Sequence, residues 1–135
     1  MRGVTEIPVA ALVVDDSMLI RHTVCRFLED RGFSVESATN GMEALERVKN
    51  RIPDIIITDM NMPNMSGSAL ITALKSEPKT AGILVITLAG KSSGFEDGEQ
   101  RANFSIFKDI DIEDQLAKAL QTVLDGKAAA KSTAL

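Results

Sequence analysis

Apolar runs and amphipathic segments alternate along the whole chain. Short runs of aliphatic and β-branched residues bounded by turn formers are typical of strands buried on both faces. The predicted strands are 9–14, 33–38, 54–59, 83–88 and 104–107. Helical spacing of apolar positions predicts helices after Ser17, after Asn40-Gly41, after Ser66 or Ser68, and over 112–123. This alternation predicts a doubly wound α/β fold, a five-stranded parallel sheet with helices on both faces.

Two segments depart from the alternating pattern. Between the last two strands the stretch KSSGFEDGEQRAN contains Gly94 and Gly98, so any helix there should be short or irregular. After Gly126 the stretch KAAAKSTAL has no apolar face. The sequence therefore predicts one domain over residues 1–125 and a loose tail over residues 126–135.

Composition narrows the class of protein. The 135 residues are 44% hydrophobic and 25% charged, as expected for one soluble globular domain. No apolar run approaches the roughly 20 residues of a membrane span, and the net charge of −4 argues against a nucleic-acid surface. The single cysteine, Cys25, cannot form an internal disulfide, which favours a reducing, cytoplasmic setting.

Acidic residues gather where the predicted strands end. Asp15 and Asp16 follow the first strand and Asp59 ends the third, and functional sites of parallel sheets lie at these carboxyl ends. If the two strands are neighbours, the carboxylates converge, and like charges ~4 Å apart repel by about 4 kcal/mol. A cation such as Mg²⁺, which prefers hard oxygen ligands, would relieve this repulsion.

Lys108, which follows the fifth strand, would add a positive charge to the same edge of the sheet. Carboxylates, Mg²⁺ and a lysine together are what transfer of a phosphoryl group onto a carboxylate requires. A simpler interpretation of Asp16-Ser17 is a helix cap with no further role.

Two stretches, LVVDDSMLIR and DIIITDMNMPNMSG, closely resemble the receiver domain of bacterial two-component response regulators. The resemblance runs from about Val9 to Val123 and implies a flavodoxin-like strand order 2-1-3-4-5. It implies that Asp59 accepts a phosphoryl group from a histidine kinase or a histidine phosphotransfer protein. It further implies a Mg²⁺ site and a phosphoryl contact whose residues are Asp16 (direct ligand), Asp15 (through water), Asp59, the Asn61 backbone carbonyl and Lys108, with Pro63 and Gly67 shaping the loop.

The chain departs from the family pattern in its second half. Ala89 stands where the family has a Thr or Ser hydroxyl, Ser105 where it has an aromatic ring, and Asp109 where it has a cis proline. Thr87 shares a face with Ala89 but lies about 6.6 Å deeper along the strand, so it should not reach the site. Without the proline we expect the Lys108 side chain to be displaced. We therefore expect phosphorylation to persist and the output to use a non-standard switch.

Other functions stay open at this stage. The altered switch positions favour a receiver fold that serves as a phosphate-independent docking module, whereas the full set of acids and Lys108 oppose it. A phosphatase with an aspartyl nucleophile is less favoured, because Asn61 stands where those families place a second acid, and we expect no turnover of an external substrate. The expected partners are the phosphodonor protein and a downstream protein target, with a homodimer possible and neither nucleic acid nor membrane involved.

Overall fold

The computed structural model describes residues 9–62, 65–90, 102–108 and 111–133, with backbone alone from 123 onward. Five parallel strands form one sheet in the order β2-β1-β3-β4-β5, which confirms the predicted architecture. The strands are β1 (Ala10–Val14), β2 (Ser34–Ala38), β3 (Ile55–Asp59), β4 (Leu84–Ala89) and β5 (Phe104–Phe107). The helices are α1 (Met18–Glu29), α2 (Gly41–Asn50), α3 (Gly67–Lys75) and α4 (Ile112–Thr133).

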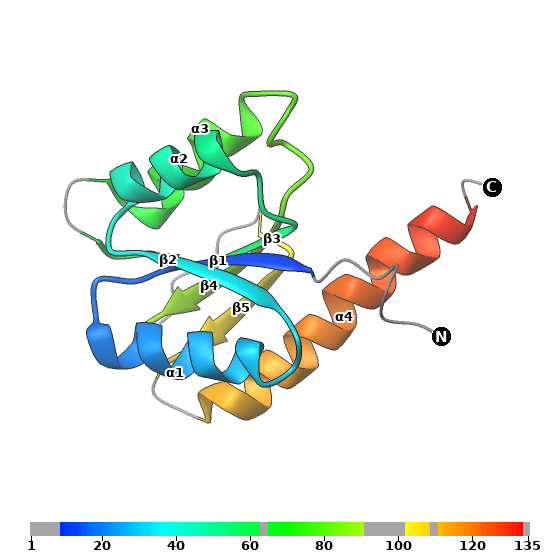
Figure 1. Cartoon of the computed structure of the whole chain (residues 1–135), viewed down its shortest axis with the longest axis horizontal. Helices are drawn as coiled ribbons and strands as arrows, with labels where there is room; N and C mark the ends of the chain where they lie inside the picture. Colours follow the sequence, from blue (N-terminus) through cyan, green and yellow to red (C-terminus); the bar gives the residue numbers. More distant parts are fainter. Residues whose placement is uncertain (1–8, 63–64, 91–101, 109–110, 134–135) are drawn as a thin grey trace.

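Helices cover both faces of the sheet, with α2 and α3 on one side and α1 and α4 on the other (Figure 1). Every residue of β3 is buried, as expected for a central strand with apolar side chains on both faces. The side chains of Ile55 and Ile57 pack toward α1 and α4, whereas Ile56 packs toward α2 and α3. Alternation along the strands thus builds two cores, one on each face of the sheet.

Polar caps fix where the helices begin. The Ser17 hydroxyl accepts a hydrogen bond from the Ile20 amide, and the Ser66 hydroxyl accepts one from the Ala69 amide. Each satisfies an amide of a first helical turn, which otherwise has no partner within its helix. Ser17 and Ser66 are therefore the N-caps of α1 and α3, and both helices start directly beside the acidic strand ends.

The carboxyl-terminal segment differs from the expected loose tail. The helix α4 continues through Gly126 to Thr133, and Figure 1 shows its end projecting beyond the sheet. This segment has no apolar face, but the run KAAAK has high intrinsic helix propensity. The stretch predicted to be short or irregular, 91–103, lies mostly outside the described residues. Among the described helices, none combines the length and the apolar character needed to cross a membrane.

Candidate functional site

The strand order brings the predicted acids together. Because β1 and β3 are adjacent and Val14 lies opposite Thr58, the residues that follow, Asp15 and Asp59, lie side by side. One carboxylate oxygen from each of Asp15, Asp16 and Asp59 lies within 4.8 Å of the others. Asp15 is 0% exposed and Asp59 is 3% exposed, whereas Asp16 is exposed at the rim. The site therefore has two buried carboxylates and one that faces solvent.

Backbone amides orient the two buried carboxylates. The Ser17 amide donates to Asp15 Oδ1 at 2.8 Å, and the Asn61 amide donates to Asp59 Oδ1 at 3.2 Å. The Arg21 guanidinium, which the sequence did not single out, donates to the Asp15 backbone carbonyl at 2.9 Å. Every residue carries a backbone carbonyl, so neither the type of the Arg21 side chain nor its position in the sequence predicts this contact. The second oxygen of each carboxylate, Oδ2, faces the space between Asp15 and Asp59.

Lys108 completes the site, and the expectation that its side chain would be displaced is wrong. Its Nζ lies 2.9 Å from Asp15 Oδ2 and 3.1 Å from Asp59 Oδ2. The Lys108 backbone amide donates to the Ala89 carbonyl at 2.8 Å, which continues the pairing of β5 with β4 past the strand end. The strand end and two attracting carboxylates thus place the ammonium over the site, whereas Asp109 itself lies outside the described residues.

The charges in the site perturb one another. Burial, and then the negative charge of Asp15, raise the pKa of Asp59, while Lys108 acts in the opposite direction. Burial disfavours the charged form of Lys108, but the carboxylates of Asp15 and Asp59 outweigh it and raise the Lys108 pKa. With all groups ionised, the three acids and one lysine carry a formal charge of −2. The site therefore retains an excess of negative charge that a cation would offset.

The residues present fit a magnesium ion. Asp15 Oδ2 is buried and accepts no hydrogen bond of regular geometry from the described residues, although the Lys108 ammonium is close to it. Burial of a carboxylate oxygen without a partner costs free energy unless a charged group approaches it. The donors are hard oxygens on a partly open rim, which suits an ion that keeps several of its waters.

The loop after β3 returns close against the strand end. The Gly67 amide donates to the Met60 carbonyl at 3.1 Å, which places the start of α3 directly beside Asp59. A Cβ atom at Gly67 would collide with the Asp59 carbonyl oxygen and would lie 2.8 Å from Met60 Cα. Both obstacles are backbone atoms, so only glycine fits without a shift of the strand end.

We expect Gly67→Ala to destabilise the fold by about 1–3 kcal/mol, the usual cost of forcing extra volume into a packed site. The displaced strand end should also slow any reaction at Asp59. Thermal unfolding checks the first effect. Gly82→Ala is the matched control, because a Cβ atom there would meet nothing within 4 Å. Equal stability of the two variants would contradict this interpretation of the loop.

The hydroxyl of Thr87 is engaged away from the acids. It donates to the Ser105 hydroxyl at 2.8 Å, across the β4–β5 pair in which these two residues lie opposite each other. Asp59 lies opposite Leu88, so the strand end nearest the site carries Ala89, without a hydroxyl. Thr87 therefore does not reach the site, as expected. The Thr87–Ser105 pair itself was not predicted, because it depends on the register of β4 and β5.

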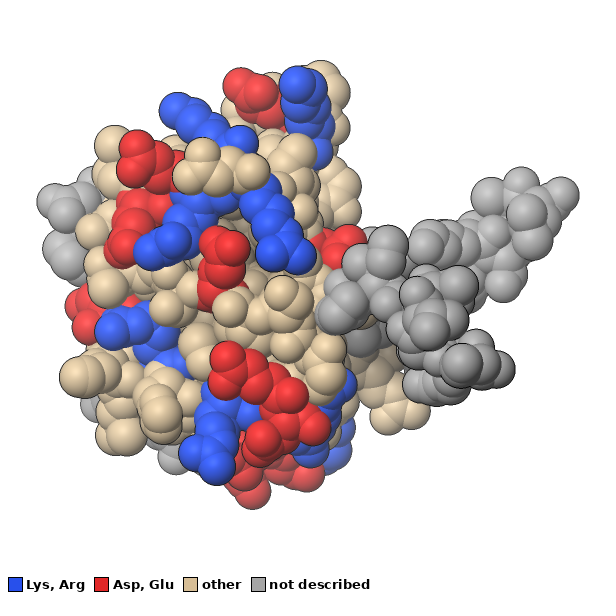
Figure 2. Space-filling model, viewed as in Figure 1, with Lys and Arg blue, Asp and Glu red and all other residues tan. Residues whose placement is uncertain are grey.

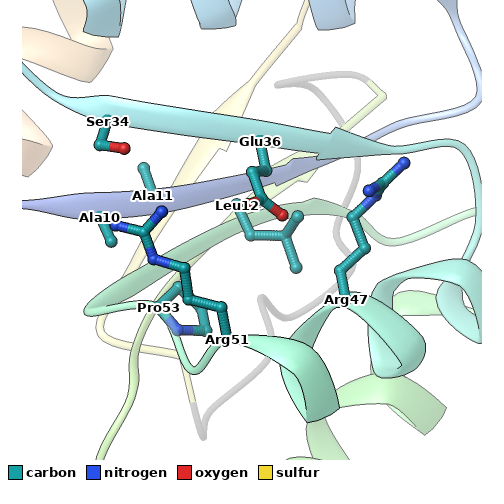
Figure 3. A pocket seen from close by; sticks show the side chains of 8 residues that line it. All are labelled: Ala10, Ala11, Leu12, Ser34, Glu36, Arg47, Arg51 and Pro53. Carbon is teal, nitrogen blue, oxygen red and sulfur yellow. The ribbon is translucent and has the colours of Figure 1, made fainter.

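A small pocket lies at the end of the sheet opposite the acidic cluster. Figure 3 shows Arg47 of α2 and Arg51, which follows α2, beside this pocket, which is lined by residues of β1 and β2. This pocket has a free volume of about 10 Å³, the room of roughly one water molecule. Figure 2 shows Lys and Arg interspersed with Asp and Glu over the visible face that carries α1, β2 and α2. Neither feature offers a second binding site comparable to the acidic cluster.

Comparison with known proteins places most of the chain in one protein family. The model of the response regulator receiver domain matches residues 11–121. Over 96 residues the chain is 42% identical to a gliding motility regulatory protein of Myxococcus xanthus, and over 98 residues it is 37% identical to the response regulator MprA of Mycobacterium sp. (strain KMS). These matches cover 68% and 67% of this chain but only 12% and 43% of those proteins.

Solved structures match over most of the chain. The chemotaxis response regulator CheY4 of Vibrio cholerae superposes with a TM-score of 0.78 at 31% identity, covering 87% of this chain and 99% of that chain. A receiver domain of a signal transduction histidine kinase from Syntrophus aciditrophicus gives a TM-score of 0.76 at 33% identity, covering 87% and 90%. The chain therefore belongs to the response regulator receiver domains of two-component signalling.

Proposed function

We propose that this domain accepts a phosphoryl group on Asp59 from the phosphohistidine of a histidine kinase or a histidine phosphotransfer protein. Receiver domains exchange signals with histidine kinases and with downstream proteins. The observation that carries it is the contact of one ammonium, Lys108 Nζ, with Asp59 Oδ2 at 3.1 Å and Asp15 Oδ2 at 2.9 Å. A lysine held against a buried, amide-oriented carboxylate is the arrangement that phosphoryl transfer needs.

The chemistry follows from these contacts. An Asp59 oxygen attacks the phosphorus, the P–N bond of the donor breaks, and its electron pair returns to the imidazole nitrogen. The Asn61 amide fixes the rotation of the attacking carboxylate, which keeps it in a productive orientation. Lys108 can turn from the carboxylates to the incoming phosphoryl oxygens and offset their charge. The product is an acyl phosphate that adds about −1.5 to −2 charge at the strand end.

A bound Mg²⁺ would be held by the carboxylates of Asp15, Asp16 and Asp59 and by the Asn61 backbone carbonyl. It would supply further neutralisation of the phosphoryl charge. The buried Asp15 oxygen without a regular hydrogen bond supports this assignment, as does the excess negative charge of the cluster. Removal of the ion would leave Lys108 as the only described cation in contact with Asp59.

The output uses protein contacts through a switch that differs from the family pattern. Ala89 has no hydroxyl to follow the phosphoryl group, and the Thr87 hydroxyl is already engaged by Ser105 one layer below. A phosphate-independent docking module is the second candidate, and the same substitution at Ala89 favours it. Binding of a downstream protein that is equally tight with and without phosphorylation would favour the docking module over the phosphoacceptor.

Intact-mass spectrometry with a small phosphodonor tests the proposed reaction. After incubation with acetyl phosphate and Mg²⁺ we expect one phosphoryl adduct per chain, because the donor's phosphorus meets the Lys108–Asp59 pair. With EDTA in place of Mg²⁺ the adduct should fall to the background level, since the acidic cluster then repels the anionic donor. An adduct of equal yield in EDTA would contradict the proposed role of the metal.

A further inference from the structure

The strand that carries Lys108 lies at the edge of the sheet. In the strand order β5 has only β4 as a neighbour, so every second residue directs its amide and carbonyl away from the sheet. Lys108 directs its amide toward β4, where the Ala89 carbonyl accepts it at 2.8 Å. The preceding residue, Phe107, therefore presents its amide and carbonyl to the open edge.

A side chain from α4 occupies this edge. The Phe107 amide donates to Gln115 Oε1 at 3.0 Å, and Gln115 Nε2 donates to the Phe107 carbonyl at 2.7 Å. One carboxamide thus supplies both an acceptor and a donor to the same residue, as a neighbouring strand would. We call this pair of hydrogen bonds between Gln115 and Phe107 the edge clamp.

The clamp is anchored in the core. Gln115 lies in the first turn of α4, and its backbone amide donates to the Asp111 carbonyl at 3.2 Å. The next residue, Leu116, is 0% exposed and belongs to the same core cluster as Ile106 of β5. The carboxamide is therefore held at a fixed height relative to the strand. Phe107 and Lys108 are tied on one side to α4 and on the other to β4.

We propose that Gln115 is a positioning residue for Lys108, acting through the backbone of Phe107. The inference rests on the proposed function, in which Lys108 contacts the phosphoryl group. A displacement of Phe107 passes directly to the Cα atom of Lys108, the adjacent residue, and from there to an ammonium that must meet Asp15 and Asp59 together. The edge clamp accounts for the position of Lys108 even though Asp109 stands where the family has proline.

Two substitutions at residue 115 test the clamp. Gln115→Leu removes both hydrogen bonds of the edge clamp, together with the contact of Gln115 Nε2 with the Asp111 carbonyl at 3.3 Å, while keeping high helix propensity. Gln115→Glu keeps an acceptor for the Phe107 amide but loses the donor to its carbonyl. We expect Gln115→Leu to slow Mg²⁺-dependent phosphorylation by acetyl phosphate by about 10- to 100-fold, the range that a misplacement near 1 Å produces. Gln115→Glu should fall between Gln115→Leu and the unsubstituted protein.

Gln121→Leu is the matched control, because Gln121 is exposed on the same helix, and its rate should not change. The decisive comparison uses Lys108→Ala as background. If Gln115 acts through Lys108, Gln115→Leu has no further effect in a chain that already lacks the ammonium. A similar slowing in both backgrounds, or no slowing in either, would overturn the inference.

A crystal structure of Gln115→Leu gives a readout that does not depend on phosphorylation. We expect Lys108 Nζ to move beyond about 4 Å, the limit of an ion pair, from at least one of the Asp15 and Asp59 carboxylates. An unchanged position of Nζ would overturn the role of Gln115. Failure of the unsubstituted protein to take up phosphate would instead overturn the proposed function, and the crystallographic distance would still decide the inference.

Discussion

Lys108→Ala is expected to slow phosphorylation of Asp59 by about 100-fold or more. Lys108 Nζ lies within 3.1 Å of both buried carboxylates, so among the described residues it is the cation in direct contact with the atoms where charge accumulates. Removing one well-placed donor from the site of developing negative charge typically costs 10²–10³ in rate. Initial rates of adduct formation with acetyl phosphate and saturating Mg²⁺ measure the effect.

The same variant should still bind Mg²⁺, because its acidic ligands remain and a competing cation has been removed. Lys118→Ala serves as the control, since Lys118 forms an exposed ion pair with Asp114 on α4, far along the chain from the acidic strand ends. A Lys108→Ala rate close to that of Lys118→Ala would show that the ammonium has no part in the transfer.

Asp15→Asn is expected to lose phosphorylation while the fold keeps or gains stability. Asp15 is fully buried beside Asp59, and its negative charge contributes to the raised pKa of Asp59. Asparagine retains an oxygen for the Ser17 amide and leaves Lys108 paired with Asp59 alone. In EDTA we therefore expect a melting temperature roughly 2–5 °C higher, which corresponds to about 1 kcal/mol for a domain of this size.

Asp16→Asn separates metal binding from burial. Asp16 is exposed, so its replacement should weaken Mg²⁺ binding without changing the melting temperature measured in EDTA. Isothermal titration with Mg²⁺ and thermal unfolding of both variants check these expectations. A loss of stability in Asp15→Asn larger than that in Asp16→Asn would mean that the Asp15–Lys108 ion pair outweighs the repulsion between the carboxylates.

The arrangement of the acids was predictable because burial and strand order determine it. Apolar runs such as Ile55-Ile56-Ile57 that are bounded by turn formers are typical of central strands, and parallel strands direct their carboxyl ends to one edge. Asp15 follows one such strand and Asp59 ends the other at an equivalent height, so their convergence depends on no finer detail of packing. The Ser17 cap was equally predictable, because it depends only on contacts within four residues.

The position of Lys108 was not predictable in the same way. The expectation of a displaced side chain considered only the peptide that follows Lys108, where proline is missing. In the structure Gln115, seven residues away, holds the preceding residue, and two carboxylates from other strands attract the ammonium. Such contacts between distant segments leave no periodic signal in a sequence. The Thr87–Ser105 pair escaped prediction for the same reason, since it depends on strand register.

The most direct test is intact-mass spectrometry of the Asp59→Asn variant beside the unsubstituted protein after acetyl phosphate and Mg²⁺. Asp30→Asn, which changes an exposed acid at the end of α1, is the control. We expect a single adduct in the unsubstituted protein and in Asp30→Asn, and none in Asp59→Asn. An adduct that persists in Asp59→Asn, or no adduct in any chain that binds Mg²⁺, would contradict the assignment of Asp59 as the phosphoacceptor.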